Sequence, residues 1–116
     1  MDTVLYLQKL GLTGYQASVL SAILDRQNST ALEMTGMTGV PYTKIYYVLD
    51  SLRYMGFVVA DLERPMRFRA SGIDDIVDRL VKRHSESLSR VKRVGEEVKL
   101  AYRPNGDEFH DIQKAI

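Results

Sequence analysis

The stretch GVPYTKIYYVLDSLRYMGFVVADLERPMRFR, residues 39–69, decides the fold of this chain. Its first half repeats apolar side chains with the period of about 3.6 residues that is typical of a helix burying one face. These side chains are Val40, Ile45, Val48, Leu49 and Leu52. After Gly56 the sequence alternates with period two, as in a β-hairpin with one buried face, and it carries three arginines. A helix that ends at a glycine and leads into a basic hairpin is the layout of a winged helix-turn-helix.

The residues ahead of this stretch predict three further helices. Residues 3–10 read as a short apolar helix. Thr13 and Gln16 fit a capping box, in which each side chain accepts a backbone N–H of the other residue, and this box opens the second helix. A second capping box, Thr30 with Glu33, opens a short third helix. The expected apolar positions of that third helix are Leu32, Met34 and Met37.

A tight turn separates the third helix from the helix of the opening stretch. Thr38 and Gly39 form this turn, and Pro41 starts the next helix because its φ is already close to the helical value. A short helix, a tight turn with glycine and a longer helix are the local signals of a helix-turn-helix. In the hairpin that follows, Phe68 is expected to face the helices while Arg67 faces solvent.

A long helix is predicted from Ser71 as far as Pro104, because the segment between them contains no proline. Apolar side chains repeat every seven residues in two complementary registers for about four heptads, which indicates a coiled coil. At 1.5 Å per residue this helix would be roughly 45 Å long, too long to bury that face on one small domain, so a second copy of the chain is the expected partner. The residues around the repeat leave parallel and antiparallel pairing open. The side chains expected at the dimer interface are Ile73, Val77, Leu80, His84, Leu88, Val91, Val94 and Val98.

The expected fold class is therefore mainly α with a small β-hairpin wing. Residues 1–70 form the predicted winged helix-turn-helix domain, residues 71–103 the coiled-coil dimerisation helix, and residues 104–116 a short tail.

Composition limits the alternatives. The chain has 116 residues and a net charge of +1, so binding to a polyanion would depend on where the charges lie rather than on their sum. It has no cysteine, which excludes disulfides and thiolate metal sites. No apolar run approaches the roughly 20 residues that span a bilayer, and the first residues do not fit a signal peptide. We therefore expect no membrane partner and a cytoplasmic, nucleoid-associated location.

The runs LGLTGYQASVLSAIL, GVPYTKIYYVLDSLRYMGFV and ERPMRFRA, in this order, resemble the N-terminal module of the archaeal TrmB-like transcriptional regulators. The similarity extends over about residues 5–100, since that module is also followed by a coiled-coil helix. It implies a winged helix-turn-helix and a role in transcription regulation. Longer family members carry a sugar-binding domain after the coiled coil, whereas only RPNGDEFHDIQKAI follows here. The chain is either a short regulator or a fragment of a longer one.

The N-terminal turns of a recognition helix are the part that normally reaches base edges. Tyrosine hydroxyls suit phosphate oxygens, and Lys44 is the strongest donor in these turns. Tyr46 could instead pack in the core or at the rim of the helix. The candidate DNA contacts of this helix are Tyr42, Thr43, Lys44, Tyr46 and Tyr47.

The candidate DNA contacts of the wing are its three arginines. Arg64, at the tip, suits insertion into a minor groove, and Arg67 suits a phosphate contact. Arg69, near the base of the wing, could instead pair with Asp74 or Asp75. The alternative for the outer face of the wing is a solvated surface whose arginines pair locally with Asp61 and Glu63.

Enzyme chemistry finds no support in the sequence, and no catalytic residue, cofactor or metal is expected. His84 lies inside a heptad, and His110 lies with Asp107, Glu108 and Asp111 in a segment better explained as a solvated tail than as a metal site. RNA binding is less favoured because no sheet of stacking aromatic residues is evident.

The leading hypothesis is a homodimeric, sequence-specific regulator that binds double-stranded DNA at an inverted repeat. The alternative is a winged-helix module whose recognition helix binds a protein of a transcription or assembly complex. The sequence does not identify the operator, any small-molecule effector, or whether the chain represses or activates transcription.

Overall fold

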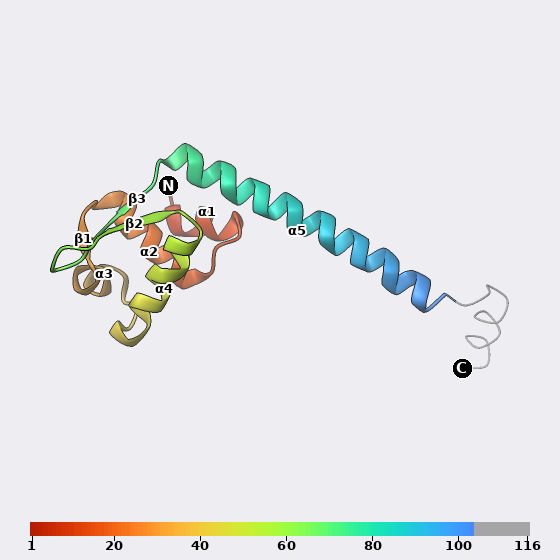
Figure 1. Ribbon diagram of the computed structural model, residues 1–116, viewed down its shortest axis with the longest axis horizontal. Coiled ribbons are helices and arrows are strands. Elements are labelled where there is room, and N and C mark those ends of the chain that lie inside the picture. The colour runs from red at the N-terminus through yellow and green to blue at the C-terminus, as the bar shows by residue number, and fades with distance from the viewer. Residues whose placement is uncertain (104–116) are drawn as a thin grey trace. The chain divides into compact units, whose positions relative to one another are not determined.

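A computed structural model of the chain describes residues 1–103 (Figure 1). The predicted tail, residues 104–116, lies outside the described residues, and so does the acidic segment around His110. The elements are α1 (Thr3–Lys9), α2 (Gly14–Asp25), β1 (Ser29–Thr30), α3 (Ala31–Thr38), α4 (Tyr42–Tyr54), β2 (Val58–Asp61), β3 (Arg67–Ala70) and α5 (Ile73–Ala101). The predicted winged helix-turn-helix followed by a long helix is confirmed.

The chain divides into two compact units, Met1–Val81 and the residues from Lys82 onward. The first unit contains every element from α1 to the beginning of α5. The described part of the second unit is the rest of α5 and the two residues after it.

Both predicted capping boxes are present. The Thr13 Oγ1 atom accepts the Gln16 N–H at 3.2 Å, and Gln16 Oε1 accepts the Thr13 N–H at 3.0 Å. The same pair of bonds, each 3.2 Å long, joins Thr30 and Glu33 at the start of α3. These bonds satisfy backbone N–H groups that the first helical turn leaves free, so the sequence sets where α2 and α3 begin.

A glycine follows each of the two helices of the helix-turn-helix, α3 and α4. Gly39, after α3, has φ of 75°, and Gly56, after α4, has φ of 81°. A residue with a Cβ atom is strained in this left-handed conformation, whereas glycine, which has no Cβ atom, adopts it readily. The turn between α3 and α4 and the start of the wing therefore lie where glycine occurs in the sequence.

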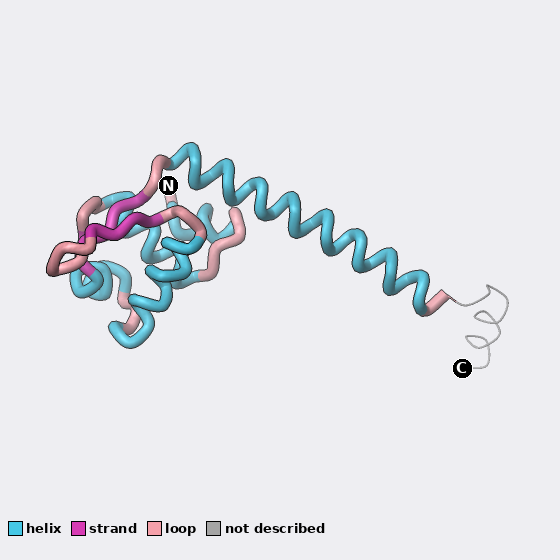
Figure 2. The backbone as a smooth tube through the Cα atoms, in the orientation of Figure 1, coloured by secondary structure: helices cyan, strands magenta, loops and turns pink. Residues whose placement is uncertain are grey.

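The wing is a three-stranded antiparallel sheet in the order β1-β3-β2, with the two longer strands side by side (Figure 2). The sequence predicts β2 and β3 but not β1, whose two residues are too few to show a period. Phe68 lies opposite Ser29 on one side and Ala60 on the other, and its side chain is buried. The predicted alternation on β3 is confirmed, since Arg67 and Arg69 are exposed.

The core of the first unit lies where α2, α4 and the sheet meet. Val19, Leu20 and Ile23 from α2 and Ile45 and Leu49 from α4 are fully buried.

The three apolar side chains of α3 differ in burial. Met34 is buried, whereas Leu32 is 71% exposed and Met37 is also exposed. Ala31 is the other buried residue of this helix. With only eight residues, α3 turns a narrow face to the core.

The first turns of α5 belong to the core of the first unit. Ile76 is fully buried and Leu80 is 2% exposed, both within the same cluster as Leu49 and Phe68. Leu80 was expected to face a second chain, so its placement is a correction: its surface is already covered within its own chain. Ser71 was expected to open the helix, and its hydroxyl instead donates to the Gly56 carbonyl at 2.7 Å.

No helix of residues 1–103 combines the length and the apolar character needed to cross a membrane.

Candidate nucleic-acid interface

The first turns of α4 present polar and aromatic side chains to solvent. Ile45, Val48, Leu49 and Leu52 hold the opposite face of the helix in the core. Tyr47 is 81% exposed, and Tyr46 is 43% exposed, so Tyr46 is not a core residue. All five residues proposed as base or phosphate contacts of this helix are exposed: Tyr42, Thr43, Lys44, Tyr46 and Tyr47.

Tyr42 and Tyr46 form an ordered pair on this surface. Their rings meet edge to face, with centroids 5.9 Å apart and planes at 88°. A hydrogen bond with the Tyr42 side chain is the main cause that raises the pKa of Tyr46, with burial second. The positive charge of Arg64 acts in the opposite direction on this pKa, and it is the weakest of the causes. The charge of the wing tip therefore influences the head of α4.

A hollow of about 630 Å³ lies between the start of α2 and the exposed face of α4. Its floor contains a polar link, because Gln16 Nε2 donates to Ser51 Oγ at 3.2 Å and this hydroxyl donates to the Val48 carbonyl at 2.6 Å. The residues that line it are Thr13, Tyr15, Gln16, Thr43, Lys44, Tyr47, Val48 and Ser51. Sequence reasoning did not place the residues of α2 near the contact surface, although the capping box at Thr13 showed where α2 begins.

The three wing arginines have different surroundings. The side chains of Arg64 and Arg69 are exposed and make no hydrogen bond or ion pair with other residues of the described chain. Arg67, by contrast, donates from Nη1 to the Asn28 carbonyl at 2.9 Å and lies 3.5 Å from Glu33 Oε1. Arg67 is exposed, as expected, but its guanidinium has partners within its own chain, and its contact with phosphate stays a prediction.

The local partners suggested for the wing arginines have other roles. The Asp61 carboxylate accepts the Glu63 N–H at 3.1 Å, which stabilises the tip of the hairpin. Asp75 forms an ion pair with Arg79 at 3.0 Å instead of pairing with Arg69.

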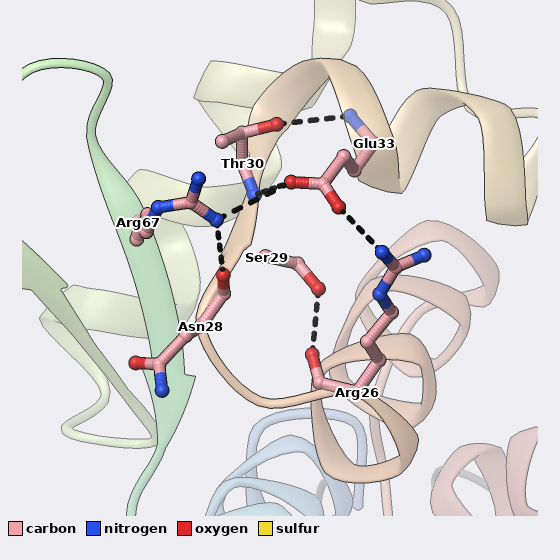
Figure 3. Close-up of polar contacts among 6 residues, drawn as sticks. All are labelled: Arg26, Asn28, Ser29, Thr30, Glu33 and Arg67. Carbon is pink, nitrogen blue, oxygen red and sulfur yellow. Dashed lines mark hydrogen bonds and ion pairs between the residues drawn. The ribbon is translucent and has the colours of Figure 1, made fainter.

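Glu33 is the centre of a polar cluster between α2, α3 and the wing, which we call the Glu33 cluster: Arg26, Asn28, Ser29, Thr30, Glu33 and Arg67 (Figure 3). Glu33 Oε2 lies 3.0 Å from Arg26 Nη2, while Oε1 accepts the Thr30 N–H and faces Arg67. The Thr30 backbone hydrogen bond, the Thr30 hydroxyl and the two arginines lower the pKa of Glu33. The carboxylate is therefore charged at neutral pH. Sequence reasoning assigned Glu33 to the capping box alone.

The later part of α5 carries an exposed apolar stripe. Leu88, Val91, Val94 and Val98 are between 49% and 63% exposed, and spacings of three and four residues place them along one side of the helix. His84 is also exposed. Of the expected interface residues nearer the first unit, Ile73 is half exposed and Val77 is partly buried.

Histidine and acidic side chains of residues 1–103 do not gather into a group of three that could hold a metal ion.

This combination of a helix-turn-helix, an exposed α4 and a three-stranded wing defines the winged helix-turn-helix class of transcriptional regulators. A MarR-family transcriptional regulator from Rhodococcus sp. RHA1 has a similar fold, with a TM-score of 0.51 and 20% identity over 80% of this chain and 76% of that one. The archaeal chromatin protein TrmBL2 aligns with a TM-score of 0.65 and 24% identity, over 88% of this chain and 41% of that one.

Sequence comparison narrows the class to a family. The family model described as "Sugar-specific transcriptional regulator TrmB" matches residues 7–74. The HTH-type sugar sensing transcriptional regulator TrmBL1 of Pyrococcus furiosus is 30% identical over 107 residues, which is 91% of this chain and 30% of that protein. The chain belongs to the TrmB family. Membership places it among transcriptional regulators rather than among enzymes, and the chain spans less than a third of the length of this relative.

Proposed function

We propose that this chain is a sequence-specific regulator of transcription that binds double-stranded DNA as a homodimer, with one recognition helix in each half of an inverted repeat. The observation that carries the proposal is the exposed head of α4 together with the exposed Arg64 of the wing, which has no ion pair in the described chain. One helix for the major groove and one cation for the adjacent backbone or minor groove form the contact set of a winged helix. Family membership supports the same function.

Specificity is proposed to depend largely on DNA shape. The first turns of α4 offer Thr43, Lys44 and tyrosine hydroxyls, and they contain no arginine, asparagine or glutamine. Of the side chains whose pairing with base edges discriminates bases by about 1–3 kcal/mol each, these turns therefore offer Lys44 alone. Arg64 entering a narrow minor groove would supply selectivity for sequences that narrow that groove.

The exposed stripe on α5 supports a dimer. Leu88, Val91, Val94 and Val98 leave apolar surface in water that a second α5 would cover. Two copies of the chain would then present two recognition helices, as an inverted repeat requires.

Sugar sensing is a property of TrmBL1, and the match covers only 30% of that protein. Our proposal for this chain is limited to DNA binding and regulation.

The test is a fluorescence-anisotropy titration of the chain against its own upstream intergenic DNA and against a scrambled duplex, each at two salt concentrations. We expect preferential binding to the upstream duplex, two chains per duplex, and an affinity that falls steeply with salt because phosphate contacts release counterions. No binding to either duplex at low salt would overturn the proposal. It would favour the alternative, a protein-binding winged helix, for which the highly exposed Tyr47 and Tyr54 on α4 would form the contact surface.

A further inference from the structure

Strand β1 joins one edge of the wing to the start of α3. Thr30, the N-cap of α3, lies directly opposite Arg67 in the register of β1 and β3. Because β3 is the central strand, this pairing ties the whole wing to the beginning of α3. The backbone pairing covers only Ser29 and Thr30, so side chains must supply much of what holds the wing at this edge.

The Arg67 side chain supplies such a contact. Its Nη1 atom reaches the Asn28 carbonyl at 2.9 Å and Glu33 Oε1 at 3.5 Å, which lie on either side of β1 in the chain (Figure 3). Glu33 is itself held in place by the Thr30 N–H and by Arg26. The guanidinium thus spans from the central strand of the wing to the first turn of α3.

These contacts distinguish Arg67 from Arg64. The Nη1 atom of Arg67 is engaged by both the Asn28 carbonyl and the Glu33 carboxylate, and its charge is partly compensated by Glu33, which also pairs with Arg26. Arg64 has neither restraint, and it is exposed. The two arginines are three residues apart, so the direction of β3 determines where the tip that carries Arg64 is presented.

We propose that Arg67 is a positioning residue rather than a DNA contact: through Glu33 and the Asn28 carbonyl it fixes the wing against α3, so that Arg64 is presented beside the head of α4. This inference rests on the proposed DNA-binding function and assigns the Glu33 cluster a part in it.

The two possible roles of Arg67 predict opposite effects of Glu33→Gln. Glutamine also completes a capping box, so α3 keeps its start. If Arg67 contacted phosphate, removing the neighbouring negative charge would free the arginine and strengthen DNA binding. If Arg67 positions the wing, the loss of its ionic partner weakens binding. We expect E33Q to lower the affinity for the upstream duplex about 2- to 5-fold, the range of exposed ion pairs.

Glu63→Gln is the matched control. It removes one negative charge at the wing tip from a side chain that makes no ion pair in the described part of the chain. We expect E63Q to leave the affinity unchanged or to raise it. Arg67→Met, which keeps the aliphatic part of the side chain, should weaken binding as E33Q does. The double variant E33Q/R67M should bind no more weakly than R67M alone, because both substitutions remove the same ion pair between Glu33 and Arg67.

Salt dependence and binding stoichiometry separate a positioning role of Arg67 from a phosphate contact and from a role in stability alone. The Arg64→Ala background separates the two roles: if Arg67 bound a phosphate, R67M would reduce the slope of log affinity against log salt by about a further 0.9 in this background, whereas a role in positioning Arg64 leaves the slope of R64A unchanged. A role in stability alone would lower the fraction of chain able to bind, measured by stoichiometric titration, and would leave the Kd of that fraction unaltered.

Tighter or unchanged binding by E33Q, or a smaller salt slope in R64A/R67M than in R64A, would overturn the inference while the proposed function stands. Failure of the unsubstituted chain to bind either duplex would overturn both.

Discussion

Val91→Asp should separate the dimer into single chains. Val91 lies in the middle of the exposed stripe on α5 and is 63% exposed in the single chain. In a dimer a second α5 would bury this stripe. The aspartate carboxylate of V91D would then be buried as well, which is unfavourable. The substitution therefore acts on the interface and leaves the core of the first unit untouched.

The magnitude follows from the exposed fraction. Complete burial of a valine side chain contributes about 1.5 kcal/mol, so covering 63% of Val91 contributes about 1 kcal/mol per chain. A symmetric dimer contains the residue twice, which makes the loss about 2 kcal/mol before the cost of burying carboxylates. The dimer Kd should rise about 30-fold or more.

Sedimentation equilibrium across a range of protein concentrations measures this Kd directly. Ser89→Asp is the control, because it places the same charge two residues away, on the side of the helix turned from the stripe. We expect S89D to dimerise like the unsubstituted chain. Equal Kd values for V91D and the unsubstituted chain, or equal weakening by both substitutions, would refute the assignment of the stripe as the dimer interface.

Three further predictions concern the first unit. Arg64→Ala should reduce the salt slope of DNA affinity, measured by anisotropy, by about 0.9, and an unchanged slope would argue against a phosphate contact at the wing tip. Leu80→Ala should destabilise the fold by about 2–5 kcal/mol in urea unfolding followed by circular dichroism, because Leu80 is buried in the core, and a negligible change would contradict that placement. Glu33 has a lowered pKa in the folded chain, so it stabilises the fold above the unfolded carboxyl pKa of about 4.3, and this contribution is lost as the pH falls through the folded value. The difference in Tm between the unsubstituted chain and E33Q should therefore narrow between about pH 6 and about pH 3, and a difference that widens on acidification would contradict this sign.

Features that depend on neighbouring residues could be predicted from the sequence. The capping boxes at Thr13 and Thr30 and the stop at Gly56 each involve residues within about one helical turn of one another. The exposed face of α4 follows from the period of its apolar side chains. For this reason Tyr47 and Lys44 could be assigned to the surface from the sequence alone.

Features that depend on distant residues could not be predicted. Strand β1 forms only because Ser29 finds a partner in Phe68, and its two residues show no pattern of their own. The ion pair between Glu33 and Arg67 joins the first turn of α3 to β3, which lies far along the chain. Leu80 fits the heptad pattern equally well whether its partner is a second helix or the core of its own domain, so periodicity could not distinguish them.

The two capping boxes carry a consequence for the comparison of related sequences. Within the motif itself glutamine and glutamate are interchangeable, since each accepts the N-cap N–H through a side-chain oxygen. In this fold the terminal atom of each side chain that does not take part in the capping box has a partner of its own, so the two residue types are not interchangeable. Gln16 needs its amide nitrogen to donate to Ser51, while Glu33 needs its second oxygen to pair with Arg26. We therefore expect substitutions at position 16 to be accompanied by changes at 51, and those at 33 by changes at 26 or 67, when homologous chains are aligned.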